Sequence, residues 1–287
     1  MKRTRHALWA LVFVALAAAT AWGQDQPAEK PPVELDRDHA GIKLTYWAAS
    51  YNGNIKVEDR DVFGGTGTIK GGTFNLENDL GVENPRGVPE ISAWIRLGQR
   101  NRIILSYFFA TYNGSKRLKT NQDFAGYTFS AATDLDTEFR FSRTVFMWQY
   151  NPLLTERGRL GLMVGMEYYL WRFAYDGRDV TSGVRVSKDV VLPLPVPVVG
   201  IEGEVALGAG FGLQGSLSGI GMKLNVMDVQ ASYTDLDLGI TYDYQALHAA
   251  VGYRTINTIF KGKDDQRQKF DVNFSHAGWM ATVGVNI

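Results

Sequence analysis

An unbroken alternation of residue types from Gly158 to Phe173 (GRLGLMVGMEYYLWRF) constrains the fold more than any other feature of the sequence. The even-numbered positions from Leu160 to Leu170 are apolar or amphipathic. The odd-numbered positions mix glycines and large side chains with the carboxylate of Glu167. A period of two is typical of a β-strand with two different faces. Such a strand is about twice as long as is usual in a soluble protein.

The length of this stretch fits a tilted membrane-spanning strand, which needs roughly 9–11 residues in the hydrocarbon plus residues at the interfaces. Its aromatic residues gather at one end, as interfacial girdles do. We therefore interpret 158–173 as one strand of a transmembrane β-barrel whose even-numbered face contacts lipid. Although 45% hydrophobic and 21% charged residues resemble a soluble composition, a barrel is encoded by alternation and not by apolar runs.

The same alternation recurs along the chain and predicts an all-β, antiparallel, up-and-down barrel of about ten strands. The predicted segments are 40–51, 90–97, 102–112, 134–150, 158–173, 198–207, 211–220, 235–242, 247–260 and 279–287. Eight or twelve strands are alternatives, depending on whether 211–220 and a tight hairpin predicted around Gly71-Gly72 belong to the wall. In 134–150 we expect the face with Phe139 and Phe141 to contact lipid, and Arg143 interrupts that face.

The connections between these segments alternate in length. The connections at 98–101, 151–157, 208–210 and 243–246 are short, whereas those at 52–89, 113–132 and 174–192 are long. Outer-membrane barrels have short periplasmic turns and longer extracellular loops, so the long connections are expected outside. Because proline cannot donate to a strand ladder, the wall is expected to resume only after Pro193, Pro195 and Pro197.

The first residues have the features of a targeting segment. Lys2, Arg3 and Arg5 precede a short apolar core, and Ala21-Trp22-Gly23 offers small residues for cleavage before Gln24. This pattern predicts a signal peptide over 1–23, with a membrane anchor helix as the alternative. Residues 24–39 are then a flexible periplasmic lead-in, and residues 40–287 form the barrel.

Residues 40–287 resemble a bacterial outer-membrane β-barrel protein in their girdled alternating strands, their asymmetric connections and their apolar, alternating last strand. Such barrels usually end in an aromatic residue, whereas this sequence ends in Ile287. The resemblance implies a location in the bacterial outer membrane after removal of the signal peptide. It also implies contacts with outer-membrane lipid and lipopolysaccharide, and handling by the barrel assembly machinery during biogenesis.

The predicted lumen faces collect charged residues. This candidate network comprises Glu90, Arg96, Glu138, Arg140, Glu167, Glu202, Glu204, Asp235, Asp237 and Arg254. A ten-stranded barrel has a narrow interior, and unpaired charges there are costly, so acids and arginines are expected to pair across it. One interpretation is a side-chain-filled lumen held by salt bridges. The other is a narrow polar conduit whose excess of acids favours cations.

Other chemistries find little support in the sequence. Thirty basic and thirty acidic residues cancel, which argues against nucleic-acid binding. The absence of cysteine excludes thiol catalysis, thiolate metal sites and disulfides. Ser275 and His276 near Asp271 suggest a hydrolase, but neighbours in a strand point to opposite faces. We predict no catalytic residue, no metal site and no cofactor.

Three functional hypotheses follow. The first is a membrane wall protein with a structural, anchoring or surface-binding role and a largely filled lumen. The second is a narrow diffusion channel or transporter for ions or small solutes, and the third is a hydrolase at the outer rim. Lysines expected at loop tips are candidates for contact with lipopolysaccharide: Lys116, Lys119, Lys261 and Lys263.

Overall fold

The computed structural model describes residues 39–60, 69–70, 72–79, 81, 86–124, 127–129, 131, 134–178, 185–226, 229–263 and 269–287. The signal peptide predicted for 1–23 and residues 24–38 of the lead-in lie outside this range. No helix within the described residues is long and apolar enough to cross a membrane.

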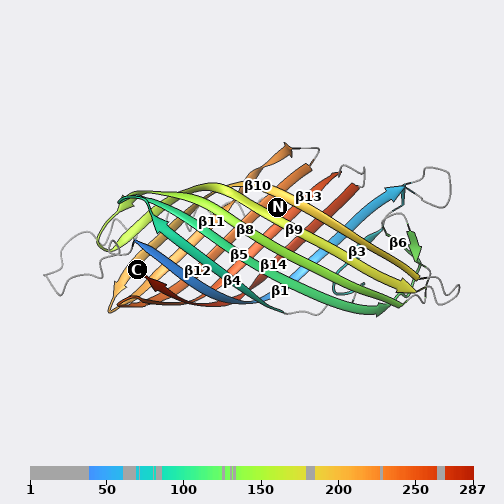
Figure 1. The fold of residues 1–287 in the computed structure, drawn as a ribbon, viewed down its shortest axis with the longest axis horizontal. Coiled ribbons are helices and arrows are strands. Elements are labelled where there is room, and N and C mark those ends of the chain that lie inside the picture. The colour runs from blue at the N-terminus through green and yellow to red at the C-terminus, as the bar shows by residue number, and fades with distance from the viewer. Residues whose placement is uncertain are drawn as a thin grey trace, which may run out of the picture.

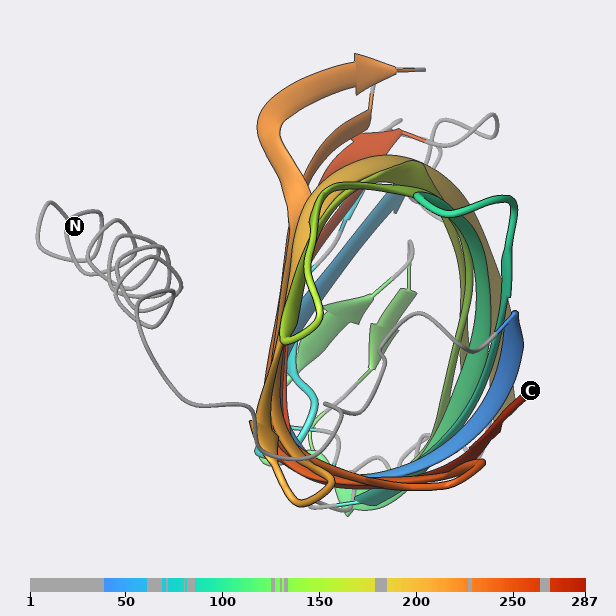
Figure 2. The ribbon, with the colours of Figure 1, turned by 90° about the vertical axis from the view of Figure 1, so that its left-hand side faces the viewer.

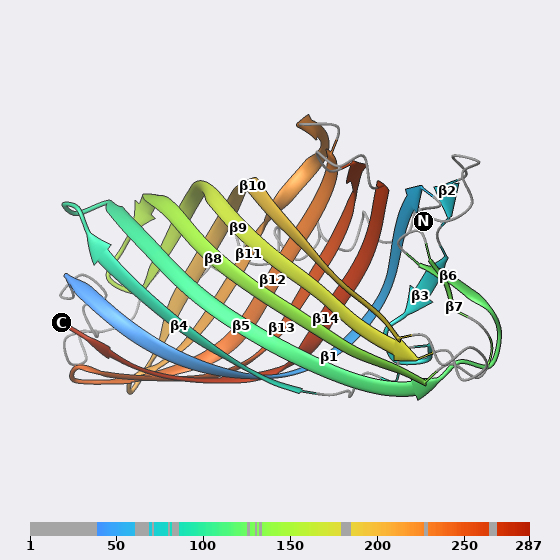
Figure 3. The same cartoon turned by 45° about the vertical axis from the view of Figure 1, so that its right-hand side comes forward.

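Ten long strands form a closed antiparallel barrel (Figures 1 and 3). They are β1 (Ala40–Arg60), β4 (Arg86–Arg96), β5 (Asn101–Arg117), β8 (Asp134–Leu154), β9 (Gly158–Arg178), β10 (Arg185–Gly208), β11 (Phe211–Val226), β12 (Val229–Tyr244), β13 (Leu247–Lys263) and β14 (Lys269–Asn286). Each pairs with the next of these, and β14 closes the barrel on β1 from Gly41↔Asn286 to Glu58↔Lys269. The ten-strand prediction is confirmed, and segment 211–220 belongs to the wall within β11.

The two ends of the barrel differ in their connections, as the sequence predicted. Tight connections join β4 to β5, β8 to β9, β10 to β11 and β12 to β13 at one end, which also holds Ala40 and Ile287. We call this the turn end, and the opposite end the loop end. In outer-membrane barrels short turns face the periplasm, so we orient the turn end that way.

The segment around Gly71-Gly72 extends the wall, but it does not form the predicted hairpin. Here β2 (Ile69–Lys70) and β3 (Thr73–Asn75) both lie antiparallel to the outer half of β1. Ile69 faces Arg60 and Phe74 faces Ile55, so β2 and β3 each pair with β1 in the same register and not with each other. A separate hairpin, β6 (Gln122–Phe124) with β7 (Tyr127–Phe129), lies at the loop end (Figure 3).

A band of exposed apolar side chains surrounds the half of the barrel nearer the turn end. On β9 the even-numbered face points outward as predicted, with Leu162 49% and Met166 51% exposed. Large apolar side chains exposed in the same way include Ile42, Leu44, Ile95, Leu105, Phe109, Phe146, Val199, Leu213, Leu238, Ile240, Val251, Trp279 and Val283. Exposed apolar surface of this extent marks a membrane-contacting face.

Toward the loop end the outer face becomes charged, because the strands continue beyond the apolar band. Arg172 on β9 bonds Asp189 on β10 at 2.6 Å, and Arg140 lies 2.7 Å from Glu138 on β8. The predicted excursions were therefore too long. Most of 174–192 is strand, with β9 ending at Arg178 and β10 beginning at Arg185. Likewise β1 continues to Arg60 and β5 to Arg117.

The faces of β8 are the reverse of the prediction. Phe139 and Phe141 are 0% and 1% exposed and point into the lumen, together with Leu135, Val145 and Met147. The lipid-facing side chains of this strand are instead Phe146 and Trp148. Above the band the outer face carries charged side chains and the inside is apolar, so the usual rule of apolar residues outward does not apply there.

The prediction that the wall resumes only after the prolines was also wrong. Pro193, Pro195 and Pro197 lie inside β10 and are paired with β9. The ladder between β10 and β11, however, begins only at Val199 opposite Gly219. Within the described residues, one edge of β10 therefore has no partner strand along the prolines, and such an edge is where proline is tolerated. In Figure 2 the loop-end arm of β11 bends away from the wall at this seam.

Candidate functional site in the lumen

The lumen is the candidate site because it gathers nearly all of the buried charged side chains. Three layers succeed one another from the turn end to the loop end: a cationic layer, a layer of linked ion pairs and a layer of aromatic rings. Each layer is built by inward-pointing residues of several strands, since alternate positions of every strand face the same interior.

The middle layer is a chain of ion pairs that crosses the barrel. Arg143 on β8 donates from Nε to Glu167 on β9 at 2.9 Å, and its Nη2 lies 3.0 Å from Asp235 on β12. Arg254 on β13 donates two hydrogen bonds to the same Asp235, at 3.0 and 2.6 Å. Its remaining Nη1 reaches Glu90 on β4. This chain, which we call the ionic lock, ties five strands together.

Two tyrosines add hydrogen bonds to the carboxylates of the ionic lock. The hydroxyl of Tyr169 donates to Glu167 at 2.6 Å, and that of Tyr233 donates to Asp235 at 3.1 Å. Both rings are buried. Glu167 and Asp235 each accept hydrogen bonds from a tyrosine as well as from an arginine, which offsets part of the cost of burying them. The lock is therefore a connected network that links five strands.

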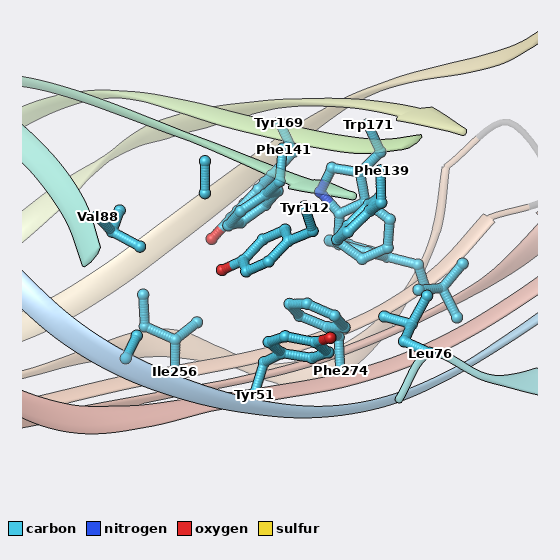
Figure 4. Packing of buried hydrophobic residues seen from close by; sticks show 14 of the residues in the cluster. Tyr51, Leu76, Val88, Tyr112, Phe139, Phe141, Tyr169, Trp171, Ile256 and Phe274 are labelled. Carbon is cyan, nitrogen blue, oxygen red and sulfur yellow. The ribbon is translucent and has the colours of Figure 1, made fainter. Parts of the chain in front are cut away.

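Rings fill the lumen between the lock and the loop end (Figure 4). The aromatic layer comprises Tyr51, Phe108, Tyr112, Phe139, Phe141, Trp171, Phe173, Phe260, Phe274 and His276, all buried. Many adjacent rings stack or meet edge to face, for example Phe139 and Phe173 at 4.7 Å between centroids. Such contacts add to the stabilisation from burial. Phe74 and Leu76, from the chain beside β1, join the same cluster.

The turn-end layer collects basic side chains. Arg102 on β5 stacks over Trp94 on β4 at 4.0 Å and lies 3.6 Å from Glu202 on β10. Arg159 on β9 bridges both acids of β10, at 2.8 Å to Glu202 and 2.7 Å to Glu204. Lys43 on β1 is within electrostatic reach of all four charged groups, and Arg96 on β4 is close to Arg102.

The structure places eight of the ten predicted network residues in the lumen. Glu90, Glu167, Asp235 and Arg254 belong to the ionic lock, Asp237 lies beside it, and Arg96, Glu202 and Glu204 belong to the turn-end layer. Glu138 and Arg140 are corrections. They pair with each other on the outer surface above the apolar band, because the faces of β8 are reversed.

The ten predicted network residues contain more acids than arginines, and in the folded barrel other basic side chains compensate this difference. Four inward cations were missed, namely Lys43, Arg102, Arg143 and Arg159, and they balance the acids of these two layers. The signal for Arg143 was present, since it interrupts an apolar face that was taken to contact lipid. The signal for Arg159 was its odd-numbered position, which it shares with Glu167 on the inward face of β9.

The lysines proposed to contact lipopolysaccharide do not form one surface. Lys116 lies on the inward-facing side of β5 and donates to the carbonyl of Asn78. Lys261 is exposed and pairs with Asp271 on the neighbouring strand at 2.7 Å. Lys119 is exposed at the loop end, and the side chain of Lys263 lies outside the described part. Contact of these four lysines with lipopolysaccharide stays a prediction.

The candidate hydrolase residues are separated. His276 is buried in the aromatic layer, where its Nε2 shares a hydrogen bond with the hydroxyl of Tyr112 at 2.9 Å. Ser275 donates to Asn257 at 2.8 Å, and Asp271 pairs with Lys261. The other histidine of the wall, His248, bonds Asp243 at 2.7 Å near the turn end. Within the described residues, no group of three or more metal-ligating side chains is found.

No protein-family model matches the chain, and no curated protein matches it in sequence. Among solved structures, the outer membrane protease OmpT from Escherichia coli is similar, with a TM-score of 0.52 and 11% identity over 92% of this chain and 99% of that chain. The translocator domain of the autotransporter NalP from Neisseria meningitidis gives a TM-score of 0.43 at 12% identity, over 98% and 97% of the two chains. The Pseudomonas putida toluene transporter TodX gives 0.34 at 11% identity, over 90% and 92%.

At such identities the likeness concerns the fold alone. The protein has the fold of bacterial outer-membrane β-barrels, and its encircling band of exposed apolar side chains fits a place in the outer membrane.

Proposed function

We propose that the protein is an integral outer-membrane wall protein with a sealed lumen, in a structural or surface-binding role, and not a diffusion channel. The observation that supports this most directly is the ionic lock, from Glu167 through Arg143, Asp235 and Arg254 to Glu90. The aromatic layer stacked on it leaves the rings of Phe139, Phe141 and Trp171 buried. Conduction needs a continuous path of groups that solvate an ion.

The test is conductance in planar bilayers, with refolded barrel verified by its heat-dependent shift in gel mobility. We expect bilayers that contain the native protein to show no stable steps in conductance. Replacing rings of the aromatic layer alone, as in Phe141→Ala with Trp171→Ala, should leave the ionic lock closed, whereas adding Asp235→Ala and Arg254→Ala to that variant is expected to introduce conductance. A matched variant on the lipid-facing side, Phe146→Ala, should produce no conductance steps. Stable conductance steps from the native barrel would overturn the proposal in favour of the channel hypothesis.

We propose further that this barrel does not act as a rim hydrolase, although one protein with a similar fold is a protease. The enclosure of His276 among rings, with a tyrosine as its hydrogen-bond partner, supports this. The Asp243–His248 pair lies near the turn end, away from the rim where the long connections are. Hydrolysis of a peptide library that His276→Ala or His248→Ala abolishes, in a folded barrel, would refute this part.

A further inference from the structure

We propose that an open groove on the outer face of the barrel, near the loop end, is a binding site for the sugar portion of lipopolysaccharide. The groove lies where β5, β8, β9 and β10 run side by side (Figure 3), and its volume is about 740 Å³. This inference rests on the surface-binding role proposed above and gives that role a class of ligand.

The register of the four strands builds the groove. Its lining consists mainly of short polar or acidic side chains from adjacent positions on neighbouring strands. They are Ser115, Asp136, Asp176 and Ser187 in one row, with Asn113 and Glu138 in the next. On β5 and β8 these positions alternate with the buried Tyr112, Leu135 and Phe139, so they point away from the lumen. The volume falls within the range of about 300–1,000 Å³ that small-molecule sites have.

The hydrogen-bonding groups of the groove are available to a ligand. Within the described residues, the amide of Asn113 and the two serine hydroxyls of the lining form no hydrogen bond with another protein group. The carboxylate of Asp136 forms no ion pair in this part of the chain, since Arg185 is bonded to Asp176 instead, with its Nε 2.7 and 3.0 Å from the two oxygens. Sugar hydroxyls donate charge-assisted hydrogen bonds to carboxylates and accept hydrogen bonds from amides. A saccharide therefore matches the groups that the groove presents.

The charge of the groove is low, which favours an uncharged ligand. Glu138 is paired with Arg140 at 2.7 Å, and Asp176 is paired with Arg185, so Asp136 carries the one uncompensated charge among the described lining residues. A single exposed carboxylate is screened within about 8 Å at physiological salt. Within the described residues, no group of three or more metal-ligating side chains is found. The lining therefore suits a hydroxyl-rich sugar better than a metal ion or a polyamine.

The height of the groove along the barrel indicates which layer of the outer membrane it meets. On β9 the apolar band ends at Leu170, and Ala174 and Asp176, which line the groove, lie four and six residues beyond it. With a rise of about 3.3 Å per residue and a tilt of about 40°, these positions stand roughly 10 and 15 Å above the hydrocarbon. The polar headgroup layer is only about 5–8 Å thick. The groove therefore opens into the layer above the headgroups, which in an outer membrane holds the sugars of lipopolysaccharide.

Binding of a soluble sugar tests the proposal directly. The probe is the lipid-free, dephosphorylated oligosaccharide of lipopolysaccharide, titrated into the refolded barrel in a zwitterionic detergent that contains no sugar, and followed by saturation-transfer NMR and calorimetry. We expect saturable binding that Asp136→Ala weakens roughly tenfold, through loss of a charge-assisted hydrogen bond. Ser115→Phe, which fills the groove without changing its charge, should abolish binding. No saturable binding, or equal binding by the native protein and both variants, would overturn the proposal.

Two controls separate the groove from a general effect of surface charge. Asp271→Ala removes one carboxylate from the outer face of β14, outside the groove, and should leave the affinity for the oligosaccharide unchanged. Spermine should not compete with the sugar, and competition at equal ionic strength would overturn the proposal, because it would show that the carboxylates attract cations in general. The result is independent of the conductance test. Stable conductance steps would refute the sealed lumen alone, whereas a non-conducting barrel that binds no oligosaccharide would refute the sugar site alone.

Discussion

Among single residues, Arg143 is the side chain on which the stability of the charged lumen depends most. It is buried at 3% exposure and contacts two carboxylates from different strands, Glu167 and Asp235. A charge in this position is stable only as long as its partners are present, because neither ion can be solvated by water. Outer-surface pairs such as Arg140 with Glu138 are hydrated and contribute little.

The first prediction concerns the pair of Arg143 with Glu167. Arg143→Met leaves the buried carboxyl group of Glu167 without its principal partner, and should lower the free energy of unfolding by about 3–5 kcal/mol. The double variant Arg143→Met/Glu167→Met should recover much of that loss, since it removes both charges of the pair. Urea titration of the refolded barrel measures both changes.

Arg140→Met is the matched control and should cost at most about 1 kcal/mol. An equal loss for Arg143→Met and Arg140→Met would contradict the assignment of Arg143 to the lumen.

Among the strands, β10 is the unusual element. It keeps its ladder with β9 along its whole length but pairs with β11 only from Val199 onward. The three prolines lie at alternate positions immediately before that point, where their missing N–H groups deprive no partner. They also block the free edge against strand pairing with another chain, a recognised way of protecting sheet edges.

The second prediction follows from that free edge. Pro195→Ala should change the free energy of unfolding by less than about 1 kcal/mol, because the restored N–H has no partner strand. Ile201→Pro, two residues into the β10–β11 ladder, should cost about 1–3 kcal/mol by breaking a ladder hydrogen bond. Amide exchange gives a second readout, since the N–H that Pro195→Ala introduces should exchange rapidly. Strong protection of that amide would show that β11 pairs there after all.

The barrel as a whole has two sections with different surroundings. Near the turn end its outside is apolar and its inside is charged. Near the loop end its outside carries ion pairs and its inside is filled by rings. The boundary on β9 lies between the exposed Leu170 and Arg172. We infer that the second section stands clear of the bilayer.

The third prediction tests this boundary. Met166→Arg places a charge on the lipid-facing side in the middle of the apolar band on β9 and should cost about 2–4 kcal/mol in bilayers. Ala174→Arg, on the same face of the same strand above the band, should cost about 0–1 kcal/mol. Unfolding titrations in liposomes measure both changes, and equal costs at the two positions would place the boundary elsewhere.

The strand count, the alternating connections and the outward face of 158–173 could all be predicted from the amino-acid sequence, because a membrane wall imposes a period of two on every strand that crosses it. Three features could be learned only from the folded barrel: which face of 134–150 points into the lumen, where in the wall the prolines lie, and which cations pair with the acids. Alternation is a local property that shows that two faces differ. Whether the apolar face contacts lipid or fills the lumen depends on the height of each residue along the barrel axis, and that height is set by the register of all ten strands together.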